Sequence, residues 1–77
     1  MRCSIKGCPG EYEARLVDHV ERRDGKPIVV TDVPALVCNV CGDTLFDVAT
    51  VKAIDAIVKN PPRSTDFAPL FKFRAVA

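Results

Sequence analysis

Four cysteines occur in two close pairs, and thiolate is a favoured zinc ligand in proteins. Cys38 and Cys41 are separated by two residues, and Cys3 and Cys8 by four. Both spacings are typical of structural zinc sites, and loops of this kind point backbone N–H groups at the sulfurs. The pairs lie 29 residues apart. The sequence therefore predicts one structural Zn²⁺ ion bound by Cys3, Cys8, Cys38 and Cys41, without which the fold is not stable.

Two other uses of these cysteines stay open from the sequence alone. A dithiol–disulfide redox couple needs only one Cys-x2-Cys segment, normally opening a helix in a βαβ unit, whereas a predicted hairpin precedes Cys38. Iron bound by four thiolates is chemically possible, and ligand spacing barely separates iron from zinc. With all four positions of the metal filled by protein, no position remains for water or substrate. We therefore expect a structural metal and no enzymatic activity.

His19 is the chain's one histidine and a further candidate ligand or base. It stands in the middle of a predicted strand, and no candidate nucleophile lies near it in the sequence. We expect His19 to be a solvated strand residue and not part of a functional site.

Charge and segment length restrict the partners. The formal net charge is +1, which becomes about −1 when four thiolates bind Zn²⁺. There is no basic stripe and no second helix for a helix-turn-helix, so we expect no direct nucleic-acid binding. Cys3 is too near the first residue for a secretory signal, and no apolar run approaches the roughly 20 residues that span a bilayer. The sequence predicts a soluble cytoplasmic protein.

The segment between the cysteine pairs predicts an antiparallel β-hairpin that brings them together. Apolar and polar residues alternate from Tyr12 to Val20, which is typical of a strand with one buried face. The face expected to be buried carries Tyr12, Ala14, Leu16 and Val20.

A predicted tight turn separates the two strands of the hairpin. Asp24-Gly25 favours a tight turn, because both residues tolerate a positive φ. The β-branched residues 28–31 predict the returning strand. Pro34 cannot donate to a strand ladder and predicts a bend, after which residues 35–37 form a short strand leading into Cys38.

After the second cysteine pair the apolar period becomes helical. Asp47 is a suitable N-cap and Asn60-Pro61 a suitable end, so we expect a helix from about 48 to 59. Its buried stripe is predicted to carry Val48, Val51, Ile54, Ile57 and Val58.

The remaining chain predicts an extended linker over 61–65 and a terminal strand over 67–75, with Phe67, Phe71 and Phe73 on one face. Two interpretations of this strand stay open. It either folds back onto a core otherwise short of aromatic residues, or serves as an edge strand for a protein partner or a second copy of the chain. We expect residues 1–60 to form the zinc-binding domain, and 61–77 a Pro-rich linker with the terminal strand. The predicted fold class is a small α+β domain.

A family resemblance is carried by the cysteines and their surroundings. The chain has a cysteine at position 3 with a second close after it, a strand pair, the segment VPALVCNVCG over residues 33–42, and Leu45-Phe46-Asp47 leading into a helix. From Cys3 to about Val58 this resembles the YgiT-type zinc finger domain, the N-terminal half of MqsA antitoxins, which also occurs as short stand-alone proteins.

The resemblance implies zinc ligands at Cys3, Cys8, Cys38 and Cys41. It also implies a protein partner, because the MqsA zinc domain binds its toxin, an RNA-cleaving enzyme. MqsA binds its operator through a helix-turn-helix, which is not found in these 77 residues, and its first cysteine pair is usually closer. The resemblance therefore predicts a zinc-binding antitoxin-like protein that neutralises a toxin of a type II pair. The alternatives are a stand-alone structural metal module or a rubredoxin-like iron electron carrier. The terminal strand, as an edge strand, separately predicts a homodimer through residues 66–77.

Overall fold

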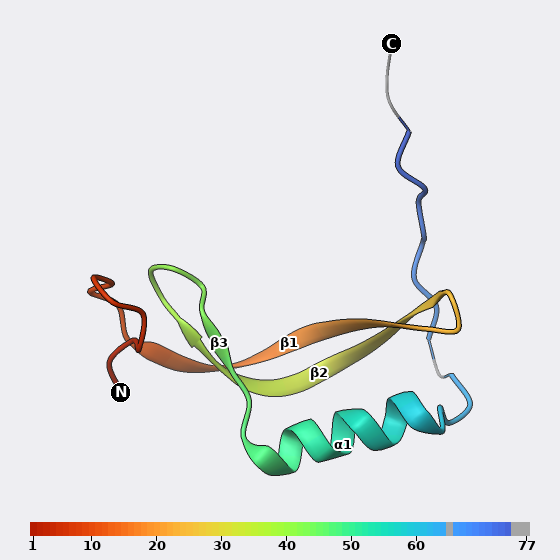
Figure 1. Ribbon diagram of the computed structural model, residues 1–77, viewed down its shortest axis with the longest axis horizontal. Coiled ribbons are helices and arrows are strands. Elements are labelled where there is room, and N and C mark those ends of the chain that lie inside the picture. The colour runs from red at the N-terminus through yellow and green to blue at the C-terminus, as the bar shows by residue number, and fades with distance from the viewer. Residues whose placement is uncertain (65, 75–77) are drawn as a thin grey trace.

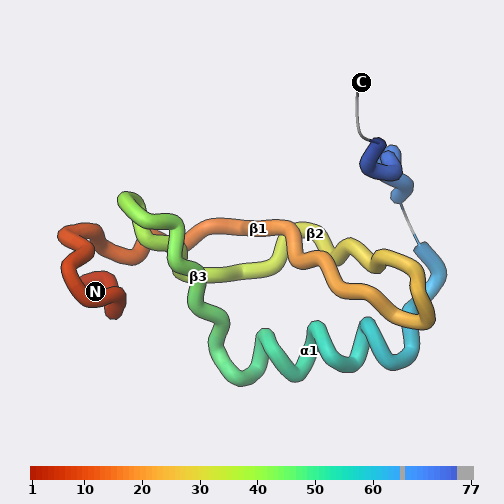
Figure 2. The backbone as a smooth tube through the Cα atoms, turned by 45° about the horizontal axis from the view of Figure 1, so that its top comes forward, coloured from red at the N-terminus to blue at the C-terminus, as the bar shows by residue number. Residues whose placement is uncertain are grey.

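The computed structural model describes residues 1–64 and 66–74 of the 77-residue chain. Its elements are β1 (Tyr12–Arg23), β2 (Lys26–Cys38), β3 (Thr44–Leu45) and α1 (Val48–Lys59). The strands form one antiparallel sheet in the order β1-β2-β3, and α1 runs along one face of the hairpin (Figure 1). Figure 2 shows the helix as a layer separate from the sheet. The expected small α+β fold is confirmed.

The hairpin turns where the sequence predicts. Arg23 pairs with Lys26, so the loop consists of Asp24 and Gly25 alone. Their φ values are 52° and 77°, the positive pair that a two-residue turn needs to match the twist of its strands.

A β-bulge lies halfway along the hairpin. Val17 pairs with Val33, but the next pair is His19 with Val30, so β2 has one residue more than β1 across this step. Asp32, one of the two β2 residues in the bulge, has a positive φ of 57°. An extra residue reverses which side chains point to a given face. Val30 and Val33, three residues apart, therefore both pack toward α1.

The predicted buried face of β1 is wrong beyond Tyr12. Leu16 and Val20 are 67% and 60% exposed, whereas Val17 packs against the core of Val33, Ile54 and Val58. Paired strands share their faces, and the helix covers the face that carries Val33. Alternation along β1 alone favoured the other face, because Val17 is the one apolar residue of β1 on the face that the helix covers.

Pro34 does not bend the chain as predicted but lies within β2, opposite Leu16. The amide of Cys38 donates to Asp43 on the β3 side. Alternate residues of a strand direct their amides to the same edge, so the Pro34 nitrogen also points away from β1. β3 reaches back only to Leu36, so that edge needs no donor at Pro34.

Helix α1 has the predicted bounds and caps. The Asp47 carboxylate accepts a hydrogen bond from the Thr50 amide at 2.8 Å, and the Asn60 amide donates to Ala56 at the other end. The predicted stripe is only partly right. Ile54 and Val58 are buried and Ile57 is half-buried, but Val48 and Val51 at the N-terminal end are exposed.

The predicted terminal strand does not form over residues 66–74, which have no regular secondary structure. Phe67, Phe71 and Phe73 are each about nine-tenths exposed or more, at 93%, 89% and 96%. The internal-packing interpretation of this segment is therefore wrong for the described residues. Thr65 of the expected linker and Ala75 of the expected strand lie outside them.

Candidate metal centre

The two cysteine pairs meet at the end of the hairpin opposite its turn. Residues 1–11 precede β1 and residues 39–43 join β2 to β3, so Tyr12 and Cys38 form the last pair of the β1–β2 ladder. Figure 1 places both loops together at this end, away from the C-terminal end of α1. The hairpin therefore brings the two cysteine pairs together, as the sequence predicts.

The four sulfurs form a compact group. Cys3 Sγ lies 3.6 Å from Cys41 Sγ, and Cys8 Sγ lies 3.6 Å from Cys38 Sγ. All four Sγ atoms lie within 4.8 Å of one another. A tetrahedron with metal–sulfur bonds of about 2.3 Å has sulfur–sulfur edges of about 3.8 Å, so the group matches the size of a four-thiolate site. All four cysteines are free thiols, and together they can hold a metal ion.

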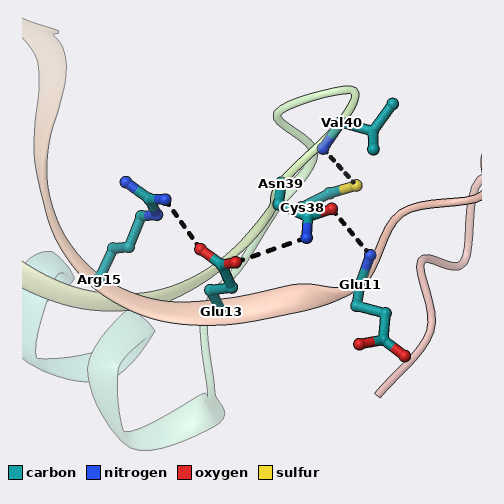
Figure 3. Close-up of polar contacts among 6 residues, drawn as sticks. All are labelled: Glu11, Glu13, Arg15, Cys38, Asn39 and Val40. Carbon is teal, nitrogen blue, oxygen red and sulfur yellow. Dashed lines mark hydrogen bonds and ion pairs between the residues drawn. The ribbon is translucent and has the colours of Figure 1, made fainter.

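The loop from Cys38 to Cys41 directs amides at a ligand atom, as its spacing predicts. Cys38 Sγ accepts from the amides of Val40 and Cys41 at 3.4 and 3.5 Å. Gly42 has a φ of 78° and donates its amide to the Cys38 carbonyl, closing the turn. Figure 3 shows the Val40 amide pointing at this sulfur.

The candidate ligand thiols Cys38 and Cys41 differ in acidity. The amides of Cys41 and Val40 stabilise the thiolate and lower the pKa of Cys38 to about 6. For Cys41 the Asp43 amide acts in the same direction, but burial and the hydrogen bonds to Cys3, Cys38 and Cys8 outweigh it and raise the pKa to about 12. A metal ion must displace the proton from such a thiol before it can bind.

The first cysteine loop is closed in a similar way. The Ile5 amide points at Cys3 Sγ at 3.5 Å, and the Cys8 amide donates to the Ile5 carbonyl at 3.1 Å. Gly7 has a φ of 83°, which lets the chain turn ahead of Cys8. The longer spacing of this pair is thus accommodated by a turn.

Gly10 is a site residue that the sequence reasoning missed. It is buried, and a Cβ at this position would overlap Cys38 Sγ and crowd Asn39 Oδ1 and Val40 Cβ at 3.0 Å each. Its carbonyl accepts from the Cys3 amide at 2.9 Å. Only glycine lets the first loop pass this close to the second, and its position two residues after Cys8 was the available signal.

Tyr12 joins the two loops through its hydroxyl. This group donates to Asp43 Oδ2 at 2.6 Å and lies 2.7 Å from Ser4 Oγ, and it also accepts from the Ser4 amide. Hydrogen bonding to Asp43 is the largest cause of a raised pKa at Tyr12. The ring is buried beside the cysteines, so the sequence correctly predicted its burial but not this connection.

Asn39 ties the second loop to β1. Its backbone amide donates to the Glu11 carbonyl at 3.0 Å, and its Oδ1 accepts from the Glu11 amide at 3.1 Å. Asn39 Nδ2 also reaches Glu13 Oε1 at 3.4 Å, and Glu13 pairs with Arg15 at 2.8 Å (Figure 3). Hydrogen bonds from Arg15 and Asn39 lower the pKa of Glu13. The loop geometry is therefore fixed by the strand beside it.

His19 does not belong to this site, and it is not solvated as expected. Its side chain is half-buried on the helix side of β1, where its ring meets Phe46 edge-on at a centroid distance of 5.9 Å. His19 Nε2 lies 2.7 Å from Glu21 Oε1. The group of potential metal ligands found among the described residues consists of the four cysteines alone.

Comparisons with protein-family models, with curated proteins and with solved structures give no match to this chain. The resemblance to the YgiT-type domain therefore stays a prediction from the residues that carry it. Over residues 1–64 and 66–74, no helix has the length and apolar character needed to cross a membrane.

Proposed function

We propose that this chain is a zinc-stabilised, non-catalytic protein of the cytoplasm that binds and neutralises a partner toxin, a small ribonuclease of a type II toxin–antitoxin pair. The observation that carries the zinc part is the group of four sulfurs within 4.8 Å of one another. Four thiolates fill the tetrahedral positions of the metal, which leaves none for a reacting water.

The partner rests on two further supports. The first is the resemblance to the YgiT-type domain, which implies a toxin. The second is the amount of apolar surface exposed on so small a chain, on the sheet at Leu16 and Val20 and along residues 67–73. Exposed apolar surface of this extent is typical of proteins that bind other proteins.

Metal content tests the first part. Purified protein should contain one zinc per chain, should be colourless, and should lose its zinc on replacement of Cys38 or Cys41 with Ser. A red protein with iron and a reversible one-electron reduction would contradict zinc and favour the electron carrier.

Neutralisation tests the second part. The candidate toxin is the product of the reading frame adjacent to the gene for this chain, and its expression alone should stop growth. Co-expression of this chain should restore growth, and the purified pair should co-elute without cleaving RNA. Cys41→Ser should abolish protection, whereas Lys52→Ala on the exposed side of α1 should retain it. Growth arrest that this chain does not relieve, with no co-elution, would contradict the toxin proposal and leave the zinc site standing.

A further inference from the structure

The hairpin has one face that nothing in the described structure covers. The helix packs on the face of Val17 and Val33, whereas the opposite face, here called the open face, is exposed along most of its length. The open face carries Ala14, Leu16, Val20, Val29, Pro34 and Leu36. Register places Leu16 opposite Pro34 and Val20 opposite Val29, so these side chains form an apolar strip that Asp18 interrupts between Leu16 and Val20.

A hollow indents one end of this strip. It has a volume of about 390 Å³ and is open to solvent. It lies at the edge of β2, where Ala14, Pro34 and Leu36 of the open face meet Ala35, Leu45, Phe46 and Asp47. Hollows of this kind, next to an apolar surface, accept aromatic anchors in protein interfaces.

The chain itself carries such anchors on residues 66–74, here called the aromatic tail. Phe67, Leu70, Phe71 and Phe73 are all strongly exposed there. Figure 1 shows this segment following α1, passing beside the hairpin turn and extending away from the sheet of its own chain. The tail thus presents its side chains outward.

The charges of the two surfaces are mainly complementary, although Arg22 lies at the turn end of the open face and Asp66 begins the tail. The tail carries Lys72 and Arg74 beside its phenylalanines, and neither forms an ion pair with another described residue. On the hairpin, Asp18 stands between Leu16 and Val20, and Asp32 projects at the bulge; both are exposed and likewise without an ion pair among the described residues. Opposite charge favours approach of the tail to the open face.

The surface area of the chain is large enough for a dimer. Its accessible surface is 6675 Å², whereas a folded monomer of 8.4 kDa exposes about 4,600 Å². A standard interface buries roughly 800 Å² per partner, so covering the tail and the open face would bring the exposed area closer to that of a compact monomer.

We propose that the aromatic tail of each chain docks on the open face of a second copy, which forms a two-fold symmetric homodimer. Phe71 or Phe73 fills the hollow beside Leu36, and Lys72 and Arg74 come near Asp18 and Asp32 of the other chain. Each chain has both the tail and the face, so two copies related by a two-fold axis can exchange their tails reciprocally. This inference is tested apart from the toxin proposal, but the dimer would cover Leu16, Val20 and residues 67–73, the same apolar surface that supports a toxin partner.

Solution mass tests the dimer. Zinc-loaded protein at about 100 µM, a concentration at which a standard interface stays closed, should have twice the mass of the 8.4 kDa chain. The tail variant Phe71→Thr/Phe73→Thr and the face variant Leu16→Thr/Val20→Thr should each have the monomer mass. Val48→Thr, which alters an equally exposed valine on α1, should remain a dimer. Far-UV circular dichroism and zinc content should be unchanged in all three, so that loss of the dimer is not loss of the fold.

A mixing experiment tests reciprocal docking. The tail variant, labelled with ¹⁵N, retains an intact face, and the unlabelled face variant retains an intact tail. Mixing them should shift the amide signals of Leu16 and Val20, and a partner that carries both sets of substitutions should cause no shift. A wild-type monomer, tail or face variants that stay dimeric, or a mixture without these shifts would overturn the proposal. A tail that folds onto the face of its own chain, or that binds only a different protein, would leave the wild-type protein monomeric.

Discussion

The two cysteine loops approach each other closely at Gly10. A Cβ added to this residue would overlap Cys38 Sγ. Gly10→Ala must push the loops apart, because a Cβ has no room beside the sulfur. We expect this variant to hold zinc at least about tenfold more weakly, in the range found when the surroundings of a metal site are altered. Competition with a coloured chelator measures the change. Glu11→Ala, at the exposed next residue, is the matched control and should bind as wild type does.

Tyr12 gives a second prediction at the level of single residues. Tyr12→Phe keeps the buried ring but removes the hydroxyl that joins Ser4 to Asp43. Because this bond positions the two loops and ligates nothing, zinc should still bind at one per chain but should transfer to a chelator about tenfold faster. Ser64→Ala removes a remote hydroxyl and should change nothing. An unchanged transfer rate in Tyr12→Phe would mean that the hydrogen bonds do not hold the loops.

The acidity of Cys41 predicts how metal binding responds to pH. Its pKa is raised to about 12, so in the metal-free site this thiol keeps its proton throughout the neutral range. Each thiol that must lose a proton on binding lowers the apparent zinc affinity about tenfold per unit fall in pH. Affinity should therefore fall at least tenfold per unit between about pH 8 and about pH 6, measured by chelator competition. A flat profile would contradict protonated thiols in the free site.

At the level of elements, the features set by neighbouring residues were predictable from the sequence, and those set by residues distant in the sequence were not. The helix was predicted with its bounds because Asp47 and Asn60-Pro61 act on neighbouring backbone groups. The turn was predicted because Asp24 and Gly25 supply two positive φ values. These outcomes depend on residues only a few positions apart.

The covered face of β1 could not be predicted in the same way. It depends on the bulge at Asp32 and on where α1 returns to the sheet, both of which involve residues distant in the sequence. The cysteine group was predictable because the chemistry of four thiols restricts them to a few arrangements. The surroundings of the group, Gly10 and the Tyr12 hydroxyl, were not, because no ligand motif contains them.

Packing of the helix is tested at Ile54. It is buried in the core with Val33 and Val58, so Ile54→Ala should lower the free energy of unfolding by about 2–4 kcal/mol through lost burial and the cavity left behind. Lys52→Ala, on the exposed side of the same helix, should cost little. Chemical denaturation of the zinc-loaded protein measures both values. Equal effects from the two substitutions would mean that α1 does not pack on the sheet through Ile54.

For the whole molecule, the interior is too small to account for a stable fold. The buried cluster under α1 consists of Val33, Ile54 and Val58 with a few half-buried residues around them, and the other buried apolar side chains described are Tyr12, Ala35 and Cys38. A chain of this length gains only about 3–5 kcal/mol from its core. Structural zinc contributes about 10–16 kcal/mol of apparent binding free energy, which exceeds that amount. Because the cysteine loops also close the open end of the hairpin, loss of the metal should release the sheet as well as the site.

Removal of the metal tests this account most directly. Zinc-loaded protein is treated with excess strong chelator at neutral pH under reducing conditions, and its far-UV circular dichroism and thermal melting are recorded before and after. We predict loss of the strand and helix signal and of the cooperative transition, both restored when one equivalent of zinc is added back. A chelated protein that is free of metal yet keeps its spectrum and a cooperative melt would show that the four-cysteine centre does not hold this fold together.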